Sequence, residues 1–123
     1  MVKASSSGWS SDLSGGAETI VARATAPGPS ALAVVRLSGP DARRIASEIS
    51  PAVDFGEPWR ARLVALDGLD ERAVAVAFAA PRSYTGEDML ELILHGSTYL
   101  VGAVIDACVA AGARPARPGE RSF

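Results

Sequence analysis

Hydrophobic residues along this chain form segments of two kinds, and the order of the segments limits the folds that the chain can adopt. Segments rich in β-branched and aliphatic residues, typical of strands, are residues 19–24, 31–38, 60–66, 72–79 and 89–95. Asp67 and Gly68 supply a turn between the third and fourth of them. Apolar residues at helical spacing follow the second strand and again the fifth. The predicted order is therefore strand, strand, helix, strand, strand, strand, helix.

Turn and capping residues mark the ends of these segments. Residues 26–29, Ala-Pro-Gly-Pro, end the first predicted strand. Residues 38–41, Ser-Gly-Pro-Asp, place a proline and an acid near the start of a helix, which Pro51 stops. Ser97 is a predicted N-cap, and Gly112 suits the position after the last helical turn. The residues at helical spacing are Ala42, Ile45, Ala46 and Ile49, then Val101, Val104, Ile105 and Cys108.

This order predicts an α+β domain in which helices cover one side of a mainly antiparallel sheet. A chain of 123 residues, 48% of them hydrophobic, can form one core. Residues 1–17 are rich in Ser and Gly and predict a flexible N-terminal tail, because they cannot bury enough apolar surface to offset the entropy of ordering. The domain is therefore expected to occupy residues 18–123.

Composition argues against several classes of function. A net charge of −2 argues against a strong grip on nucleic acid, because phosphate binding needs clustered Lys and Arg. The sequence has no G-x-x-x-x-G-K-[ST] loop, so we do not expect it to hydrolyse GTP by itself. The single cysteine, Cys108, lies in a helical apolar pattern and is predicted to be a buried small hydrophobe. No apolar run is long enough to cross a membrane, and a cytoplasmic location is expected.

Two charged residues occupy strand positions that a purely structural strand does not need. Residues alternate between the two faces of a strand, so Arg36 lies on the face opposite to Val35. In the same way Glu91 lies opposite to Leu90 and Leu92, which predict the core face. A solvent-exposed sheet face accounts for such charges as readily as a partly apolar pocket with a few placed polar groups. In the pocket interpretation, a carboxylate accepts paired N–H bonds from a flat heterocycle, and an arginine holds a carbonyl or carboxylate.

Other polar features point less clearly to a site. The only histidine, His95, ends the fifth predicted strand and is more typical of a structural hydrogen-bonding residue than of a ligand contact. Residues 83–88, Ser-Tyr-Thr-Gly-Glu-Asp, are by themselves only a turn. The arginines near the C-terminus favour a solvated strand over a binding patch; they are Arg114, Arg117 and Arg121.

Several stretches together resemble the N-terminal domain of the MnmE (TrmE) family of tRNA-modification GTPases. The similarity runs from about Glu18 to the C-terminus, and the order and spacing of the stretches carry it. The stretches are residues 18–22 (ETIVA), 24–28 (ATAPG), 33–42 (AVVRLSGPDA), 83–92 (SYTGEDMLEL), 95–96 (HG), 112–114 (GAR) and 117–120 (RPGE).

The resemblance implies a folate-binding fold, a β(2)-α-β(3)-α half like that of aminomethyltransferases, which pairs with a second copy as a homodimer. It also implies that a tetrahydrofolate derivative, 5-formyl- or 5,10-methylene-tetrahydrofolate, supplies a one-carbon unit for modifying C5 of the wobble uridine of tRNA. Arg36 and Glu91 match the positions of the family's folate contacts. The full-length protein of the family adds a helical domain and a GTPase domain and works with the flavoprotein MnmG (GidA). This domain is expected to meet tRNA only indirectly.

Two stretches depart from the family pattern. The first loop reads Pro27-Gly28-Pro29-Ser30 and lacks the family's basic residue, and the family's His-Gly-Gly-Pro is here His95-Gly96-Ser97-Thr98. Two other functions therefore stay open beside the folate module. One is a structural dimerisation domain with a decayed folate site, and the other is a stand-alone folate-dependent one-carbon transferase domain.

Overall fold

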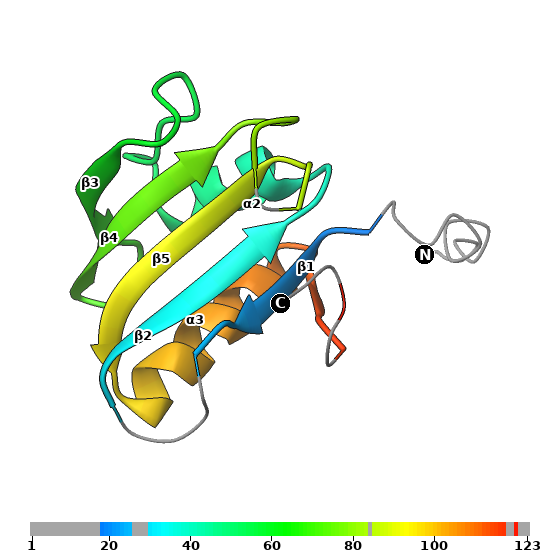
Figure 1. Ribbon diagram of the computed structural model, residues 1–123. Coiled ribbons are helices and arrows are strands. Elements are labelled where there is room, and N and C mark those ends of the chain that lie inside the picture. The colour runs from blue at the N-terminus through cyan, green and yellow to red at the C-terminus, as the bar shows by residue number, and fades with distance from the viewer. Residues whose placement is uncertain (1–17, 26–29, 84, 118–119, 121–123) are drawn as a thin grey trace.

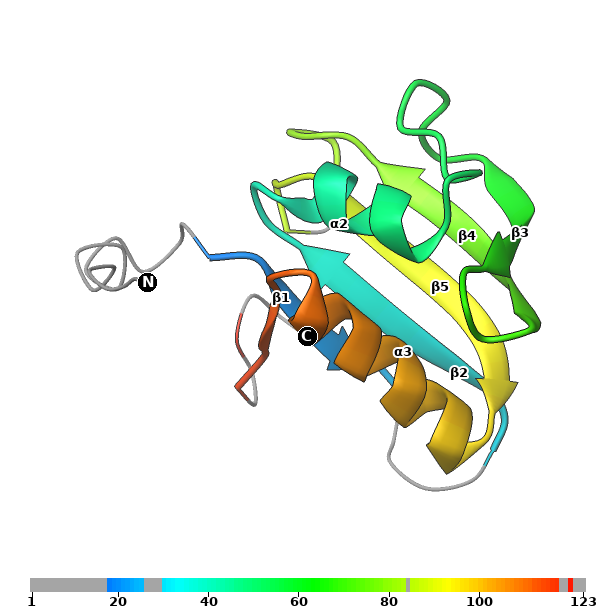
Figure 2. The same ribbon diagram turned by 180° about the vertical axis from the view of Figure 1, so that it is seen from behind.

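The structure is built on one sheet, and the helices of its described residues lie on the same face of that sheet (Figure 1). It is a computed structural model that describes residues 18–25, 30–83, 85–117 and 120. Seen from behind, α2 (Ala42–Ile49) and α3 (Thr98–Ala110) lie side by side across the strands (Figure 2). No helix of the described residues lies on the opposite face of the sheet, and we call it the open face.

The sheet has six strands in the order β3-β4-β5-β2-β1-β6. All neighbours pair antiparallel except β6, which pairs parallel with β1. The two central strands, β5 and β2, come from distant parts of the chain. The strand bounds are β1 Ile20–Arg23, β2 Ser30–Ser38, β3 Ala61–Leu66, β4 Glu71–Phe78, β5 Met89–Gly96 and β6 Arg114–Pro115.

The core lies between the sheet and the helices. Ala33, Val35 and Leu37 of β2 face it, because alternate residues of a strand share one side. The leucines of β5 at positions 90, 92 and 94 face it beside them, and all are at most 2% exposed. From the helices, Ile45, Val104 and Cys108 complete the same cluster. Burial raises the pKa of the Cys108 thiol to about 12, so this cysteine is a packing residue, as predicted.

The helix ends explain why each helix stops where it does. Ser97 Oγ accepts a hydrogen bond from the backbone N–H of Leu100 at 3.2 Å, which confirms Ser97 as the N-cap of α3. Gly112, with φ of 121°, lets the chain turn sharply after α3 toward β6. At α2, Asp41 makes no side-chain cap; its backbone N–H is instead bound by Thr19 Oγ1 at 2.8 Å.

The predicted α+β class, the order of elements and the mainly antiparallel sheet with helices on one side are confirmed. The solvated strand expected near the C-terminal arginines is present as β6, although it has only two residues and one of them is a proline. The predicted tail at residues 1–17 and the first-loop residues 26–29 lie outside the described residues.

Candidate functional site

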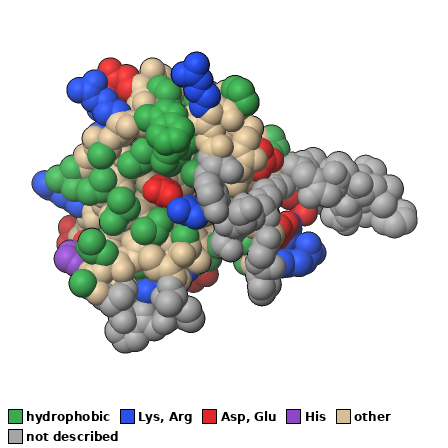
Figure 3. Space-filling model, viewed as in Figure 1, with side chains coloured by type: hydrophobic (Ala, Val, Ile, Leu, Met, Phe, Trp, Pro, Cys, Tyr) green, Lys and Arg blue, Asp and Glu red, His purple; other side chains and the backbone are tan. Residues whose placement is uncertain are grey.

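The open face of the sheet is apolar over much of its area. One row of side chains crosses four strands in register: Leu63 of β3, Val74 of β4, Ile93 of β5 and Val34 of β2. Leu63 is 60% exposed and the other three are partly exposed. Figure 3 views this face and shows hydrophobic side chains spread over it, with an acid and a base touching near its middle. A face of this kind is typical of a binding surface.

Arg36 and Glu91 form an ion pair on the open face. The strand register places them directly opposite each other on β2 and β5. Arg36 Nε donates to Glu91 Oε2 at 2.7 Å, and the side chains are 25% and 19% exposed. Ala22 of β1 pairs with Arg36, and Val76 of β4 pairs with Glu91, so the ion pair has an apolar neighbour on each outer side. The structure thus brings together the two residues that the sequence singled out separately.

The chemistry of this pair is that of a half-buried carboxylate held by one guanidinium. A charge-assisted hydrogen bond of this length is stronger than a neutral one, and low exposure weakens the competition from water. An ionised carboxylate has two oxygens with about four acceptor positions, so one bond from Arg36 leaves several for a ligand. The pair can therefore accept N–H groups from a flat, hydrogen-bonding ring.

Trp59 covers one end of the open face, a role that the sequence pattern did not indicate. Its ring meets the edge of the Phe78 ring at a centroid distance of 4.6 Å and an interplanar angle of 87°, which shields Phe78 to 8% exposure. Trp59 itself is 60% exposed and has φ of 68°, a conformation uncommon for a bulky residue. Its backbone N–H bonds to the carbonyl of Ala77, which fixes this position beside β4.

The loop between β4 and β5 is more than a turn, because polar side chains tie it to the rest of the domain. Ser38 Oγ, at the end of β2, donates to Glu87 Oε1 at 3.0 Å and lies 2.7 Å from Thr85 Oγ1. Asp88 binds Arg43 Nε of α2 at 2.8 Å and the backbone N–H of Ala80 at 2.9 Å. The hydrogen bond from Arg43 lowers the pKa of Asp88. These bonds show that Ser38, Glu87 and Asp88 connect the loop to the end of β2 and to α2.

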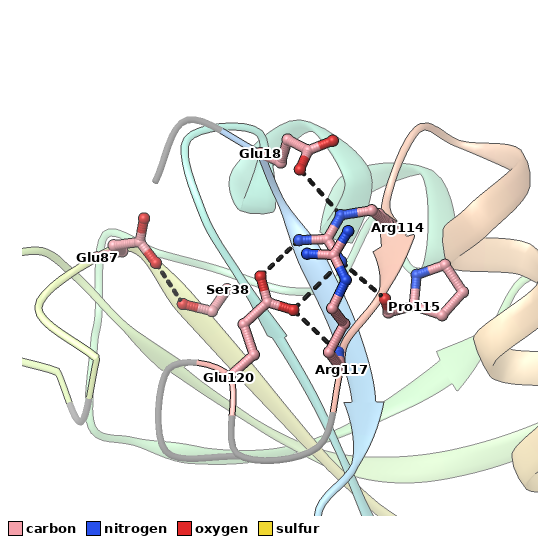
Figure 4. Close-up of polar contacts among 7 residues, drawn as sticks. All are labelled: Glu18, Ser38, Glu87, Arg114, Pro115, Arg117 and Glu120. Atoms are coloured by element: carbon pink, nitrogen blue, oxygen red, sulfur yellow. Dashed lines mark hydrogen bonds and ion pairs between the residues drawn. The ribbon is translucent and has the colours of Figure 1, made fainter. Parts of the chain in front are cut away.

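Arg114 is the centre of a second polar cluster, at the edge of the sheet formed by β1 and β6 (Figure 4). Its Nε donates to Glu18 Oε1 at 2.9 Å, and its two terminal nitrogens donate to the two oxygens of Glu120. Glu120 Oε1 also accepts the backbone N–H of Arg117 at 2.9 Å. The charge of Arg114 is thus balanced within the domain, while Arg121 lies outside the described residues.

His95 stands apart from the ion pair. It lies on the open face four residues along β5 from Glu91, about 13 Å away by strand geometry. It borders a shallow hollow of about 490 Å³, together with Leu63, Ala65, Leu66, Asp70, Glu71 and Arg72. The structure therefore gives His95 no contact with Arg36 or Glu91.

The described residues were also searched for helices that could cross a membrane and for groups of side chains that could hold a metal ion. No described helix is both long and apolar enough to cross a bilayer. Within residues 18–25, 30–83, 85–117 and 120, no three His, Cys, Asp or Glu side chains gather in a way that could hold a metal ion. The Arg36–Glu91 pair is the candidate site that we consider, because it is a partly exposed ion pair within an apolar face.

Comparison with known proteins gives a consistent result. Residues 19–123 match the family described as the N-terminus of the GTP-binding protein TrmE. Proteins called tRNA modification GTPase MnmE are 48% identical to this chain in Halorhodospira halophila, 45% in Phenylobacterium zucineum and 43% in Opitutus terrae. These matches cover 86%, 84% and 84% of this chain. They cover 23%, 24% and 23% of the three relatives, so the chain spans about a quarter of their length.

Proposed function

This chain belongs to the family of TrmE N-terminal domains, and from that premise we propose that it is the folate-binding and dimerising module of a tRNA-modification GTPase. The relatives carry the name of the whole enzyme, of which this chain matches about a quarter. The module's part is to hold a tetrahydrofolate derivative, the 5-formyl or the 5,10-methylene form. The folate supplies a one-carbon unit for C5 of the wobble uridine.

The Arg36–Glu91 pair is the observation that supports a folate site. A pterin ring presents an amino group and a ring N–H side by side, and a carboxylate is the natural acceptor for such a pair of donors. The apolar row beside it, which includes Ile93 and Val34, offers a surface for the flat faces of the ligand's rings. Small-molecule sites are usually built in this way: a few polar groups orient the ligand, and the apolar surface beside them supplies most of the affinity.

The other partners follow from the same proposal. A second copy of the chain covers the remaining apolar part of the open face, where Leu32 and Leu63 are each 60% exposed. The flavoprotein MnmG and the tRNA substrate act with the full-length enzyme. The isolated chain, with its net charge of −2, makes at most weak contact with tRNA.

Calorimetric titration of the chain with 5-formyltetrahydrofolate tests the folate site. We expect saturable binding by the wild type. Glu91→Ala should weaken it by tens to thousands of fold, because losing one partner of a buried charged hydrogen bond costs about 2–5 kcal/mol. Arg36→Ala should weaken binding as well.

Arg72→Ala is the matched control. Arg72 lies on the same open face, opposite Ala65 of β3, and is exposed and well separated from Glu91 along β4. This variant should bind folate like the wild type, and all variants should unfold at similar temperatures. Absence of wild-type binding at millimolar folate would instead favour a structural dimerisation domain whose folate site has decayed.

A further inference from the structure

We infer that the edge of the sheet at β1 carries a second binding site, which takes a small organic anion with an apolar body. The site is a hollow of about 320 Å³ between the second half of β1, α3 and the chain that follows β6, and we call it the edge hollow. Neither Arg36 nor Glu91 lines it, so the inference goes beyond the proposed folate site and does not depend on it.

The edge hollow exists because β6 is shorter than the strand beside it. β6 pairs with the first half of β1, so no strand of the described residues lies beside Ala22 and Arg23 at this edge. The backbone N–H of Ala116 still bonds to the carbonyl of Val21 at 2.9 Å, which holds the chain after β6 close to β1. On the helix side, Ile105 of α3 closes the gap (Figure 2). The result is a hollow with walls from three segments of the chain.

Most of the wall is apolar. Val21 is 1% exposed and belongs to the core, and Ile105 packs against the same core. Ala22, Pro115 and Ala116 complete the apolar lining. Ligand pockets usually occupy about 300–1,000 Å³, and the edge hollow lies at the lower end of this range, so it suits a small molecule.

The charged residues that line the edge hollow are both positive. They are Arg23 and Arg117, and among the described residues no Asp or Glu lines it. Arg23 Nε donates to Thr25 Oγ1 at 3.1 Å, which anchors this arginine beside the hollow. Guanidinium groups bind carboxylates and phosphates through paired N–H donors. An apolar wall with two such groups is therefore complementary to an anion that carries an apolar body.

The acids at this edge of the sheet are bonded to a different arginine. Arg114 Nε donates to Glu18, and its terminal nitrogens donate to both oxygens of Glu120 (Figure 4). Glu120 also accepts the backbone N–H of Arg117, but no described residue forms a hydrogen bond or ion pair with the Arg117 guanidinium. This guanidinium can therefore bind an external anion without giving up a partner within the described domain.

An NMR titration of the chain with sodium octanoate, followed at the methyl groups, tests the site. Octanoate has an apolar body and one carboxylate. We expect saturable shifts at Val21 and Ile105, and no comparable shifts at Leu63 and Val74 on the open face. Octylammonium has the same apolar body and the opposite charge, so it should bind at least about tenfold more weakly, because the two arginines repel it.

Arg117→Gln measures the contribution of the charge. This variant should weaken octanoate binding by about tenfold, as expected for the loss of one charge-assisted hydrogen bond. Arg82→Gln is the matched control, because it removes one exposed arginine from the loop between β4 and β5 and should bind octanoate like the wild type. Both variants should unfold at the temperature of the wild type, and Arg117→Gln should keep the wild-type affinity for 5-formyltetrahydrofolate.

Three results would overturn the inference. One is an octanoate titration that shifts the methyl groups of the open face and leaves Val21 and Ile105 unchanged. Another is octylammonium binding as tightly as octanoate, and the third is Arg117→Gln binding octanoate like the wild type. Each of these results leaves the proposed folate site unaffected, and a chain that binds no folate can still bind octanoate at the edge hollow.

Discussion

Arg36 and Arg114 are both held by carboxylates, but their surroundings give the two residues different roles. Arg36 shares one hydrogen bond with Glu91 on an apolar face open to a ligand. Arg114 donates to two carboxylates at the edge of the sheet and so closes a cluster within the domain. The Arg36–Glu91 pair keeps hydrogen-bond acceptor positions that a ligand can use. The Arg114 cluster instead connects Glu18 with Glu120, which lie near the two ends of the described chain.

The Arg114 cluster predicts a dependence of stability on acid. Hydrogen bonds from the side chain of Arg114 and the backbone of Arg117 lower the pKa of Glu120 from 4.5 to about 2. A carboxyl group whose pKa is lower in the folded state stabilises the fold above its unfolded pKa, and this contribution is lost as the pH falls through the folded value. The free energy of unfolding should therefore fall between about pH 4.5 and pH 2, with a contribution from Glu120 of about 1 kcal/mol or less, since solvent screens such pairs.

Urea unfolding of the wild type and Glu120→Gln at pH 7, 4 and 2.5 measures this contribution. Glu120→Gln should be less stable at pH 7 and should approach the wild type at pH 2.5. Glu48→Gln is the matched control, because Glu48 pairs with Arg44 on the exposed side of α2. Equal pH profiles for the wild type and Glu120→Gln would show that the cluster contributes nothing in solution.

At the scale of elements, local patterns predicted most of the fold. The alternation in residues 89–95 identified Leu92 as core and Glu91 as the opposite face, and burial confirms this. In residues 31–38 the alternation placed Arg36 opposite Val35, but it did not decide which face is the core, and burial shows that it is the face of Val35. Strand alternation is visible in the sequence because one face of each strand is covered by helices while the other is not.

Strand order and register could not be predicted in the same way. Arg36 and Glu91 are 55 residues apart, and their contact depends on β5 lying between β4 and β2. Nothing within either strand specifies that neighbour. Trp59 lies outside every periodic segment, and its position depends on a backbone bond to Ala77 and on the ring of Phe78. These features arise from tertiary packing, which local patterns do not record.

The start of α3 gives a prediction at this scale. Ser97 is the N-cap of α3, and its hydroxyl accepts a hydrogen bond from the backbone N–H of Leu100. Ser97→Ala should lower the free energy of unfolding by about 1 kcal/mol, whereas Ser97→Gly should lower it by only a few tenths, because glycine is tolerated as an N-cap. Urea unfolding measures both changes.

Ser47→Ala is the control for this prediction. Ser47 is an exposed serine within α2 whose hydroxyl donates to the carbonyl of Arg44. Such a bond inside a helix adds little, so this variant should stay within about 0.5 kcal/mol of the wild type. If Ser97→Ala has the same free energy of unfolding as Ser47→Ala, the Ser97 cap does not stabilise the fold in solution.

For the whole molecule, the main feature is that the described helices, α2 and α3, pack on the same side of the sheet. Among the described residues, the open face keeps Leu32, Leu63 and Trp59 each at 60% exposure. A monomer of this size seldom leaves such an apolar face exposed to water. In the proposed homodimer, a second copy of the chain would supply a matching apolar face, because a two-fold pairing needs no other protein.

Light scattering coupled to gel filtration tests this homodimer. The wild type should elute as a dimer, and Leu63→Glu should elute as a monomer, because it places a charge in the proposed interface. Leu63 is largely exposed in the single chain, so its replacement should leave the unfolding temperature of the monomer nearly unchanged. Tyr99→Glu is the control: Tyr99 is 83% exposed on α3 and should not affect the dimer. A wild type that is monomeric at high concentration contradicts the proposal.

The strand order also has a consequence for how the chain folds. The β3–β4 hairpin and its pairing with β5 bring together neighbouring segments of the chain, so they can form early. The β2–β5 ladder must close a separation of 55 residues, and the contact of Arg114 with Glu18 closes one of 96. Closing such long loops costs chain entropy before the contacts form, which slows folding. β6 is therefore expected to join the sheet last, and until then the free edge of β1 can pair with strands of other chains.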